Sequence, residues 1–389
     1  MEGAIEMKIR EVRNIGTSKQ KGDPCGCSAA VTVAEKPPCC GPLATSRGGE
    51  IDETVPGFLG WLTTEAGRVP RIGTTLSVGD RIGACKARWG IGRMSYLVPP
   101  GLYAVGNPGA GDPVIVTANY KMSYDIVRKA LANRNVWLLV LETFGINVWC
   151  AAGKGTFGTD ELVSRIKLAR LDKAVTHRTL LLPILGAPGV AAHEVARLTG
   201  FSVRYATIRA DDLPEYLDNG LVTTPAMRDL TFTFRERLVL LPVELVHALK
   251  TTVILCVCIF VIGLLSSGYL AGIKAAAAYL GAMLTGVVVG PILLPWLPGK
   301  SFSLKGAIVG LGWSSIWFLA VGGSTWGVPL TIGAFLALPA VSAFYMLNFT
   351  GCTPFTSRTG VKKEMRIALP AMGLAIALSA LILLIGCLV

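Results

Sequence analysis

The sequence predicts an α/β domain of the Rossmann-like, flavodoxin-like class, followed by an all-α region of five transmembrane helices. Between residues 114 and 207, short apolar runs alternate with stretches that suit helices of about ten residues. This alternation is typical of a parallel sheet with crossover helices. From residue 243 onward the chain has eight Lys or Arg and two Asp or Glu, against 29 and 23 before it. Such a contrast predicts a soluble domain followed by a membrane region.

The elements of the α/β domain follow from these runs. Ligands of such folds bind beyond the carboxyl ends of the parallel strands. Thr117, the turn at 147–154 and the turn at 186–189 all fall at such ends, so we expect them to line one pocket. The predicted strands are 114–118, 136–141, 179–184 and 202–207, and the predicted helices are 123–132, 160–171 with Thr159 as its N-cap, and 190–198.

A cysteine lies in the turn that follows the second strand. Asn147 is a good N-cap residue, which places Cys150 in the first turn of a short helix. The positive end of the helix dipole favours a thiolate there, the form that binds soft metals. The alternative is a buried cysteine that acts only as a small apolar side chain. The turn reads Asn147, Val148, Trp149, Cys150, Ala151, Ala152, Gly153, Lys154.

This eight-residue string resembles the cap-helix signature of the mercury-methylating corrinoid proteins. These are membrane-bound relatives of the corrinoid iron-sulfur protein and delta subunit family of CO dehydrogenase–acetyl-CoA synthase. The resemblance continues through VIVTANYK at 114–121 and LGAPGVAAH at 185–193. Together with the apolar spans, it covers roughly residues 60–389.

The resemblance implies a corrinoid-dependent methyltransferase that moves a methyl group from methyl-cobalt(III) to Hg(II) and forms methylmercury. It implies a cobalamin-type corrinoid with the Cys150 thiolate as the lower axial ligand of cobalt. A membrane-tethered corrinoid methyl carrier of one-carbon metabolism is the alternative, and a transporter or structural membrane protein without corrinoid is a third class. The expected cofactor contacts are Thr117, the eight residues from Asn147 to Lys154, Gly186, Ala187, Pro188 and Gly189.

The expected partners follow from the same resemblance. It implies a small two-cluster ferredoxin as electron donor, because the cysteines of this chain match no cluster-binding pattern and predict no iron-sulfur cluster. A methyltetrahydrofolate-dependent system would supply the methyl group. The formal charge of +12 divides evenly between the two parts, so it does not indicate nucleic acid.

Residues 1–56 read as a mobile tail that contains Cys25, Cys27, Cys39 and Cys40. The start has no apolar segment of a secretory signal peptide, so we expect these thiols to stay reduced. Their spacing matches no ferredoxin or zinc ribbon. They are either incidental cysteines or paired soft thiolates that capture Hg(II). Turn formers are dense between 57 and 113, a region expected to wrap the first strands.

Two glycine-rich turns and three histidines have plain interpretations. The turn at 106–111 precedes a strand instead of opening a helix, and the turn at 153–158 lacks the Gly-Lys-Ser/Thr ending of a P-loop. Glycines in the second turn would let the backbone approach a flat macrocycle. His177, His193 and His247 have no partner at metal-ligand spacing, so we interpret them as core or surface residues.

The domain limits are predicted at 57–242 for the corrinoid domain and 243–389 for the membrane region, whose five apolar segments are long enough to span a bilayer. The second and fourth connectors between these segments together carry six positive charges, whereas the first and third carry one. This bias predicts the inner (cytoplasmic) membrane, the α/β domain in the cytoplasm and the C-terminus outside. No charged residue lies inside the segments, which favours an anchor. Cys256 and Cys258 are small apolar fillers or a relay for a thiophilic ion. The segments are 251–270, 275–297, 306–322, 328–347 and 367–389.

Overall fold

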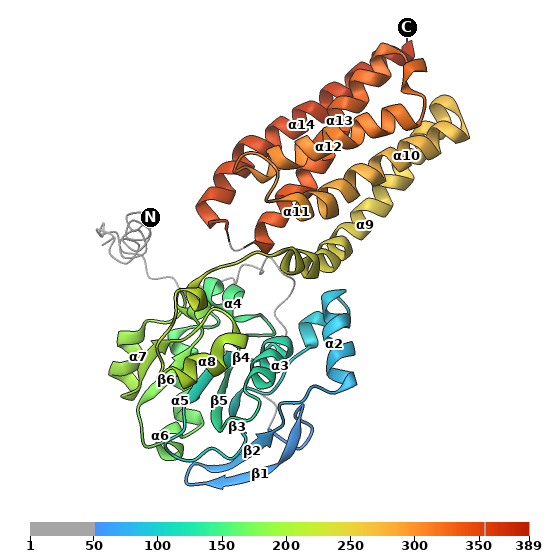
Figure 1. Cartoon of the computed structure of the whole chain (residues 1–389). Helices are drawn as coiled ribbons and strands as arrows, with labels where there is room; N and C mark the ends of the chain where they lie inside the picture. Colours follow the sequence, from blue (N-terminus) through green and yellow to red (C-terminus); the bar gives the residue numbers. More distant parts are fainter. Residues whose placement is uncertain (1–50, 354, 389) are drawn as a thin grey trace, which may run out of the picture. The chain divides into compact units, whose positions relative to one another are not determined.

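The computed structural model describes residues 51–353 and 355–388 (Figure 1). The four tail cysteines, Cys25, Cys27, Cys39 and Cys40, lie outside the described residues. An α/β sheet domain comes first in the described chain, and a helical region with five candidate membrane helices follows it. The predicted order of the two fold classes is therefore confirmed.

Seven strands form one mixed sheet in the order β1-β2-β3-β5-β4-β6-β7. Strands β5, β4, β6 and β7 are parallel to one another. Counted along the chain, these four strands have the order 2-1-3-4 of flavodoxin-like sheets. The strands are β1 (Phe58–Thr64), β2 (Gly67–Ile72), β3 (Gly101–Val105), β4 (Val114–Ala118), β5 (Val136–Leu141), β6 (Thr179–Leu182) and β7 (Ser202–Tyr205).

The region before β4, which was expected only to surround the first strands, contributes three strands of its own to the sheet. Strands β1 and β2 form an antiparallel hairpin, β2 pairs parallel to β3, and β3 pairs antiparallel to β5. The dense turn formers of this region flank short strands, so three strands extend the sheet beyond β5. The same region also forms helix α2, whose N-cap Ser77 makes a capping box with Asp80.

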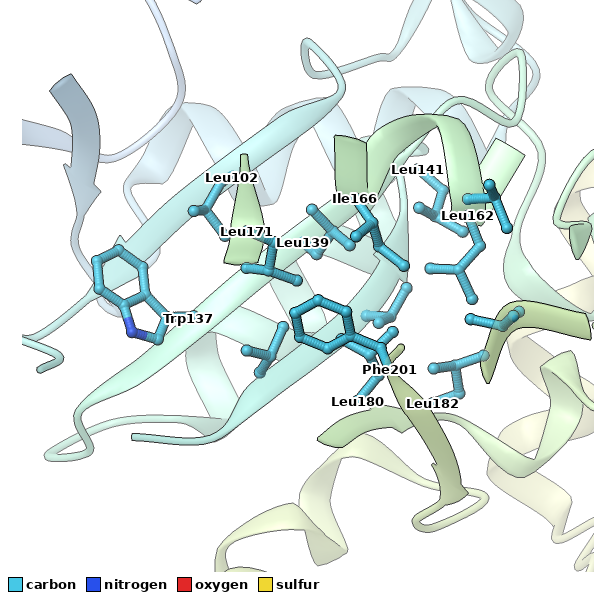
Figure 2. Packing of buried hydrophobic residues seen from close by; sticks show 14 of the residues in the cluster. Leu102, Trp137, Leu139, Leu141, Leu162, Ile166, Leu171, Leu180, Leu182 and Phe201 are labelled. Atoms are coloured by element: carbon cyan, nitrogen blue, oxygen red, sulfur yellow. The ribbon is translucent and has the colours of Figure 1, made fainter. Parts of the chain in front are cut away.

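The helices of the domain pack on both faces of the sheet. Side chains of the central strands alternate between two clusters of buried apolar residues, as the period of two requires. One cluster joins the sheet to α4, α5, α6 and α7, and Figure 2 shows part of it. The other joins the sheet to α3 and α8. The helices are α2 (Val78–Arg88), α3 (Lys121–Ala130), α4 (Val148–Lys154), α5 (Thr159–Leu168), α6 (Leu171–Ala174), α7 (Ala192–Thr199) and α8 (Leu213–Asp218).

The predicted N-cap of α5 is wrong, and several other predicted bounds differ from the structure by a few residues. The N-cap of α5 is Gly158, whereas Thr159 is the first helical residue, and its hydroxyl accepts a hydrogen bond from the amide of Ala191. Helix α9 begins at Phe234 and continues through Pro242, so one helix crosses the domain limit predicted at 242, and that limit stays a prediction. Thr233 and Glu236 make a capping box that starts α9. A strong cap therefore places the helix start ahead of the proline.

Five helices of the second region are long and apolar enough to cross a membrane. Two glycines of α12 allow it to pack closely against α13. A Cβ on Gly306 would lie 2.7 Å from Ala343 Cα, and one on Gly310 would lie 2.7 Å from Pro339 Cα. The helices are α9 (Phe234–Ser267), α10 (Tyr269–Leu284) with η5 (Thr285–Val289) and α11 (Gly290–Leu293), α12 (Phe302–Ala320), α13 (Val328–Asn348) and α14 (Arg358–Leu388).

Candidate functional site

Helix α4 holds Cys150 in its first turn, as predicted. Asn147 is the N-cap, and its side-chain oxygen accepts a hydrogen bond of 2.9 Å from the amide of Cys150. Ala151 and Ala152 are buried in the sheet cluster, so α4 is fixed on its inner side. Cys150 itself is half-buried. The thiol therefore belongs to a short, capped helix at the carboxyl end of β5.

The turn between β5 and α4 has two successive residues with left-handed backbone. Phe144 has φ +55° and Gly145 has φ +72°. Glycine is required at the second position for space as well, because a Cβ there would lie 2.6 Å from a methyl carbon of Leu97. The conformation of this turn fixes the direction in which α4 starts.

Asn119, directly after β4, binds this turn with its side chain. Its Oδ1 accepts hydrogen bonds from the amide of Thr143 at 3.0 Å and from the amide of Gly145 at 3.4 Å. Its Nδ2 donates to Glu142 Oε1 at 2.7 Å. Asn119 is 1% exposed. Sequence reasoning missed this residue, although a polar side chain directly after a buried strand is a usable signal.

A cavity of about 310 Å³ lies at the carboxyl edge of the parallel strands. It is lined from β4 by Thr117, from the start of α4 by Asn147, Val148 and Trp149, and from the loop after β6 by Pro183 and Leu185. Thr117 and the start of the predicted turn at 147–154 thus meet at one cavity, whereas the residues from Cys150 to Lys154 are not among those that line it. Helix α3 and the residues after β7 complete the wall with Ser123, Ile126, Val127, Ala206, Thr207, Ile208, Arg209, Ala210 and Leu213.

The third predicted turn, from Gly186 to Gly189, packs behind α4 and does not line this cavity. A Cβ on Gly186 would lie 2.6 Å from the ring of Phe157, and a Cβ on Gly189 would lie 2.9 Å from Ala152 Cα. These glycines therefore allow the loop to approach the α4 segment closely. Contact of Gly186, Ala187, Pro188 and Gly189 with a cofactor stays a prediction.

The last residue of α4 has an unusual environment. The Nζ atom of Lys154 is buried and has no hydrogen-bond partner in the part of the chain that the structure describes. A Cβ added to Gly153 would meet no atom within 4 Å, so space is open beside this turn. A buried amine without an acceptor costs free energy in the protein alone. It fits a site in which a bound group supplies the acceptor.

These residues fit a corrinoid. The thiol of Cys150 is a soft donor of the kind that cobalt accepts, and Lys154 supplies a donor for a polar substituent. The cavity is at the lower end of the usual size of small-molecule sites, so it would hold only part of so large a group. The remainder of the group would lie outside this cavity.

An ion cluster fixes α3, which forms one wall of the cavity. Arg128 Nε lies 2.8 Å from Asp125 and its Nη2 lies 2.8 Å from Asp80, while Lys121 Nζ lies 2.6 Å from Asp125 and 2.5 Å from Asp80. Burial alone raises the pKa of Asp80, but hydrogen bonds from Lys121 and Ser77 outweigh it and hold the pKa well below its usual range. Burial lowers the pKa of Lys121, but bonds to Asp125 and Asp80 raise it overall.

One of the three histidines bonds to backbone groups and the other two are exposed. The ring of His177 contacts the carbonyl of Asp112 at 2.8 Å through Nε2, and its Nδ1 accepts from the amide of Thr179. His193 and His247 are exposed. Within residues 51–353 and 355–388, no three His, Cys, Asp or Glu side chains form a group that could hold a metal ion.

A second cavity of about 470 Å³ lies at the opposite edge of the sheet. Pro113, Val136 and Thr179 line it, and these residues stand at the starts of their strands. Arg134 on its rim pairs with Asp218. Because the ligand edge of parallel strands is the carboxyl edge, we do not assign this cavity to the site of Cys150.

Part of the domain is similar to known proteins. Residues 93–215 match the family described as CO dehydrogenase/acetyl-CoA synthase delta subunit. The gamma subunit of the acetyl-CoA decarbonylase/synthase complex of Methanopyrus kandleri is 32% identical over 123 residues, which are 31% of this chain and 26% of the relative. The gamma subunit of Archaeoglobus fulgidus is 36% identical over 97 residues, 24% of this chain and 21% of the relative.

The gamma subunit of Methanocaldococcus jannaschii is 30% identical over 129 residues, 33% of this chain and 26% of the relative. The chain thus spans about a quarter of the length of these curated relatives. The matched segment contains β4, β5, α4 and the cavity up to Leu213. The α/β domain around Cys150 is therefore similar to a domain of these acetyl-CoA decarbonylase/synthase subunits, and this similarity supports a relationship to the corrinoid protein family.

Proposed function

We propose that this chain is a membrane-bound corrinoid protein that carries a methyl group, with the Cys150 thiolate as the lower axial ligand of cobalt. The observation that carries the proposal is the position of Cys150. It lies in the first turn of a capped helix, directly after Asn147, Val148 and Trp149, which line a cavity at the carboxyl edge of a flavodoxin-like sheet.

The residues of the chain hold and orient the group. When bound, a corrinoid supplies a cobalt centre that accepts and releases methyl groups. Cys150 would supply a soft sulfur donor to the cobalt, and the cap at Asn147 keeps the turn that carries the thiol in place. The amine of Lys154 would donate to a polar substituent of the bound group and so gain a hydrogen-bond partner.

Two methyl acceptors agree with this chemistry. The similarity of residues 93–215 to acetyl-CoA decarbonylase/synthase subunits supports a methyl carrier of one-carbon metabolism. Hg(II) as the acceptor is the finer proposal, and its support is the resemblance of the string from Asn147 to Lys154 to the mercury-methylating family. Both acceptors use the same helix and cavity.

The partners and the orientation belong to the proposal as well. A two-cluster ferredoxin would return cobalt to its reduced state, and a methyltetrahydrofolate-dependent system would deliver the methyl group. Five candidate membrane helices support a membrane protein. The positive connectors support a cytoplasmic α/β domain and an outward C-terminus.

The test starts from the full chain purified without oxygen in detergent and supplied with a corrinoid. An absorption band of sulfur-ligated cobalt is the expected result. A cobalt band without sulfur ligation would reject Cys150 as the ligand, and no cobalt band at all would reject both acceptors. The methyl-loaded protein is then given Hg(II) or, with the methyltransferase, tetrahydrofolate. If the methyl group is transferred to tetrahydrofolate and no methylmercury forms, the proposal of a one-carbon carrier stands and the proposal of mercury methylation is rejected.

A further inference from the structure

We infer that Asn119 is a positioning residue that sets the height and direction of the Cys150 helix through the turn that precedes it. The inference rests on the proposed function where it concerns cobalt. The mechanical part, from Asn119 to the amide of Cys150, is independent of any cofactor.

The backbone of Asn119 is fixed from two sides. Its amide donates to the carbonyl of Leu141 at 2.9 Å, and its carbonyl accepts from the amide of Val98 at 3.0 Å. The bond to Leu141 continues the pairing of β4 and β5 one residue beyond β4, and the bond to Val98 lies next to the isolated bridge between Leu97 and Tyr120. The side chain therefore starts from a rigid point at the carboxyl edge of the sheet.

The amide group of Asn119 can make its contacts in one orientation only. Its oxygen faces two backbone donors, the amides of Thr143 and Gly145, and its nitrogen faces the carboxylate of Glu142. Rotation by 180° would place donors against donors and oxygen against oxygen. The same Glu142 oxygen accepts from the amide of Phe144 at 2.8 Å.

The turn from Glu142 to Ile146 is thus held at three successive amides. The hydroxyl of Thr143 is 2.9 Å from Asn119 Oδ1 and 2.7 Å from the carbonyl of Ile146. A hydroxyl has one proton, and Asn119 already receives two N–H donors, so we assign this proton to Ile146. Asn119 therefore holds the start of the turn at the amide of Thr143, and the hydroxyl of Thr143 holds its end at Ile146, the residue before the cap.

The consequence for Cys150 follows from the chain direction. The turn contains Phe144 with left-handed backbone, a conformation that non-glycine residues adopt only when their surroundings hold it. Without Asn119, the turn can relax toward ordinary backbone angles. Asn147 then moves, and its bond to the amide of Cys150 weakens.

Hydrogen–deuterium exchange on the full chain in detergent, without corrinoid, tests the mechanical part. In Asn119→Ala, the amides of Thr143, Gly145 and Cys150 should exchange about tenfold faster than in the parent. Asn119→Asp keeps the acceptor oxygen but places a second oxygen against the Glu142 carboxylate, so it should restore only part of the protection at Thr143 and Gly145. The matched control is Asn219→Ala, which changes an exposed asparagine bonded to Val222 and should leave all three amides unchanged.

The corrinoid-loaded proteins provide a second readout. Asn119→Ala should shift the absorption spectrum away from sulfur ligation while the amides of β5 stay protected. An unchanged Cys150 amide together with an unchanged spectrum in a folded Asn119→Ala protein would overturn the inference. If the parent protein binds no corrinoid but the three amides respond, the proposed function fails and the positioning role of Asn119 stands.

Discussion

Lys154 lies one helical turn beyond Cys150 in α4, and its buried amine has no hydrogen-bond partner among residues 51–353 and 355–388. This relationship predicts that removal of the amine raises the stability of the corrinoid-free protein and lowers its retention of corrinoid. Lys154→Met keeps the length of the side chain and removes the unsatisfied amine, so it should stabilise the corrinoid-free protein by about 1 to 3 kcal/mol. It should also weaken corrinoid retention. Thermal unfolding and corrinoid occupancy measure the two effects, with Lys173→Met, an exposed lysine, as control. Lower stability in Lys154→Met would show that the amine has a partner.

Removal of the thiol tests the ligand directly. Cys150→Ala should lose the sulfur-ligated cobalt spectrum and most of the methyl transfer, whereas Cys150→His should keep cobalt with altered reactivity. Cys85→Ser is the control, since Cys85 is exposed on α2. Absorption spectra and single-turnover methyl transfer are the measurements. A parent-like spectrum in Cys150→Ala would exclude Cys150 as the ligand.

The N-cap of α4 should contribute to helix stability and to corrinoid retention through its hydrogen bond to the amide of Cys150. Asn147→Ala removes the acceptor of the Cys150 amide and should cost about 1 kcal/mol of helix stability. Asn147→Asp and Asn147→Ser supply another capping oxygen and should retain most of the corrinoid. Corrinoid occupancy after gel filtration distinguishes the three variants. Equal occupancy in Asn147→Ala and the parent contradicts a role of the cap in binding.

The ion cluster predicts a loss of stability in acid. The pKa of Asp80 is lower in the folded protein than in the unfolded chain, so its contribution is complete above the unfolded value of about 4 and is lost as the pH falls below it. Asp80→Asn leaves Lys121 and Arg128 with one carboxylate partner fewer and should cost about 3 to 5 kcal/mol at neutral pH.

The measurement is hydrogen exchange at α2 and α3 between pH 3 and 7, after correction for the intrinsic rates. The parent should lose protection toward pH 3, and the profile of Asp80→Asn should be flatter. The control is Asp172→Asn, an exposed residue of α6. Parallel profiles of parent and Asp80→Asn would exclude Asp80 as the titrating group.

The tail cysteines give a prediction about substrate concentration. Hg(II) binds pairs of thiolates, and Cys25 with Cys27 or Cys39 with Cys40 would form such pairs. If the tail captures Hg(II), replacing all four residues by Ser should raise the Hg(II) concentration for half-maximal methylation and leave the cobalt spectrum intact. Methylmercury formation is measured against Hg(II) concentration with the ferredoxin present. Superimposable curves would make these cysteines incidental.

The sequence predicted the elements whose signal is local. Strands β4 and β5 are unbroken apolar runs between turns, and Asn147 is a cap residue directly before Cys150, so both were predicted at the right residues. The early strands were missed because β1 and β2 contain Gly, Thr and Arg and pair only in the folded sheet. Asn119 was missed for a similar reason. Its partners lie 23 to 26 residues away, so only the pairing of β4 with β5 brings them within reach.

The glycines of the membrane helices limit how this region can move. At Gly306 and Gly310 the backbone of α12 approaches that of α13 too closely for even one added carbon atom, and Gly286 makes a similar approach to Ser342. Helices that touch through their main chains cannot slide or rotate past each other without first separating. A transporter that alternates between two arrangements would have to open these contacts in every cycle. The segment of η5 and the helices α12 and α13 are better suited to act as one preassembled unit, so removal of α12 or α13 should disrupt their neighbours as well.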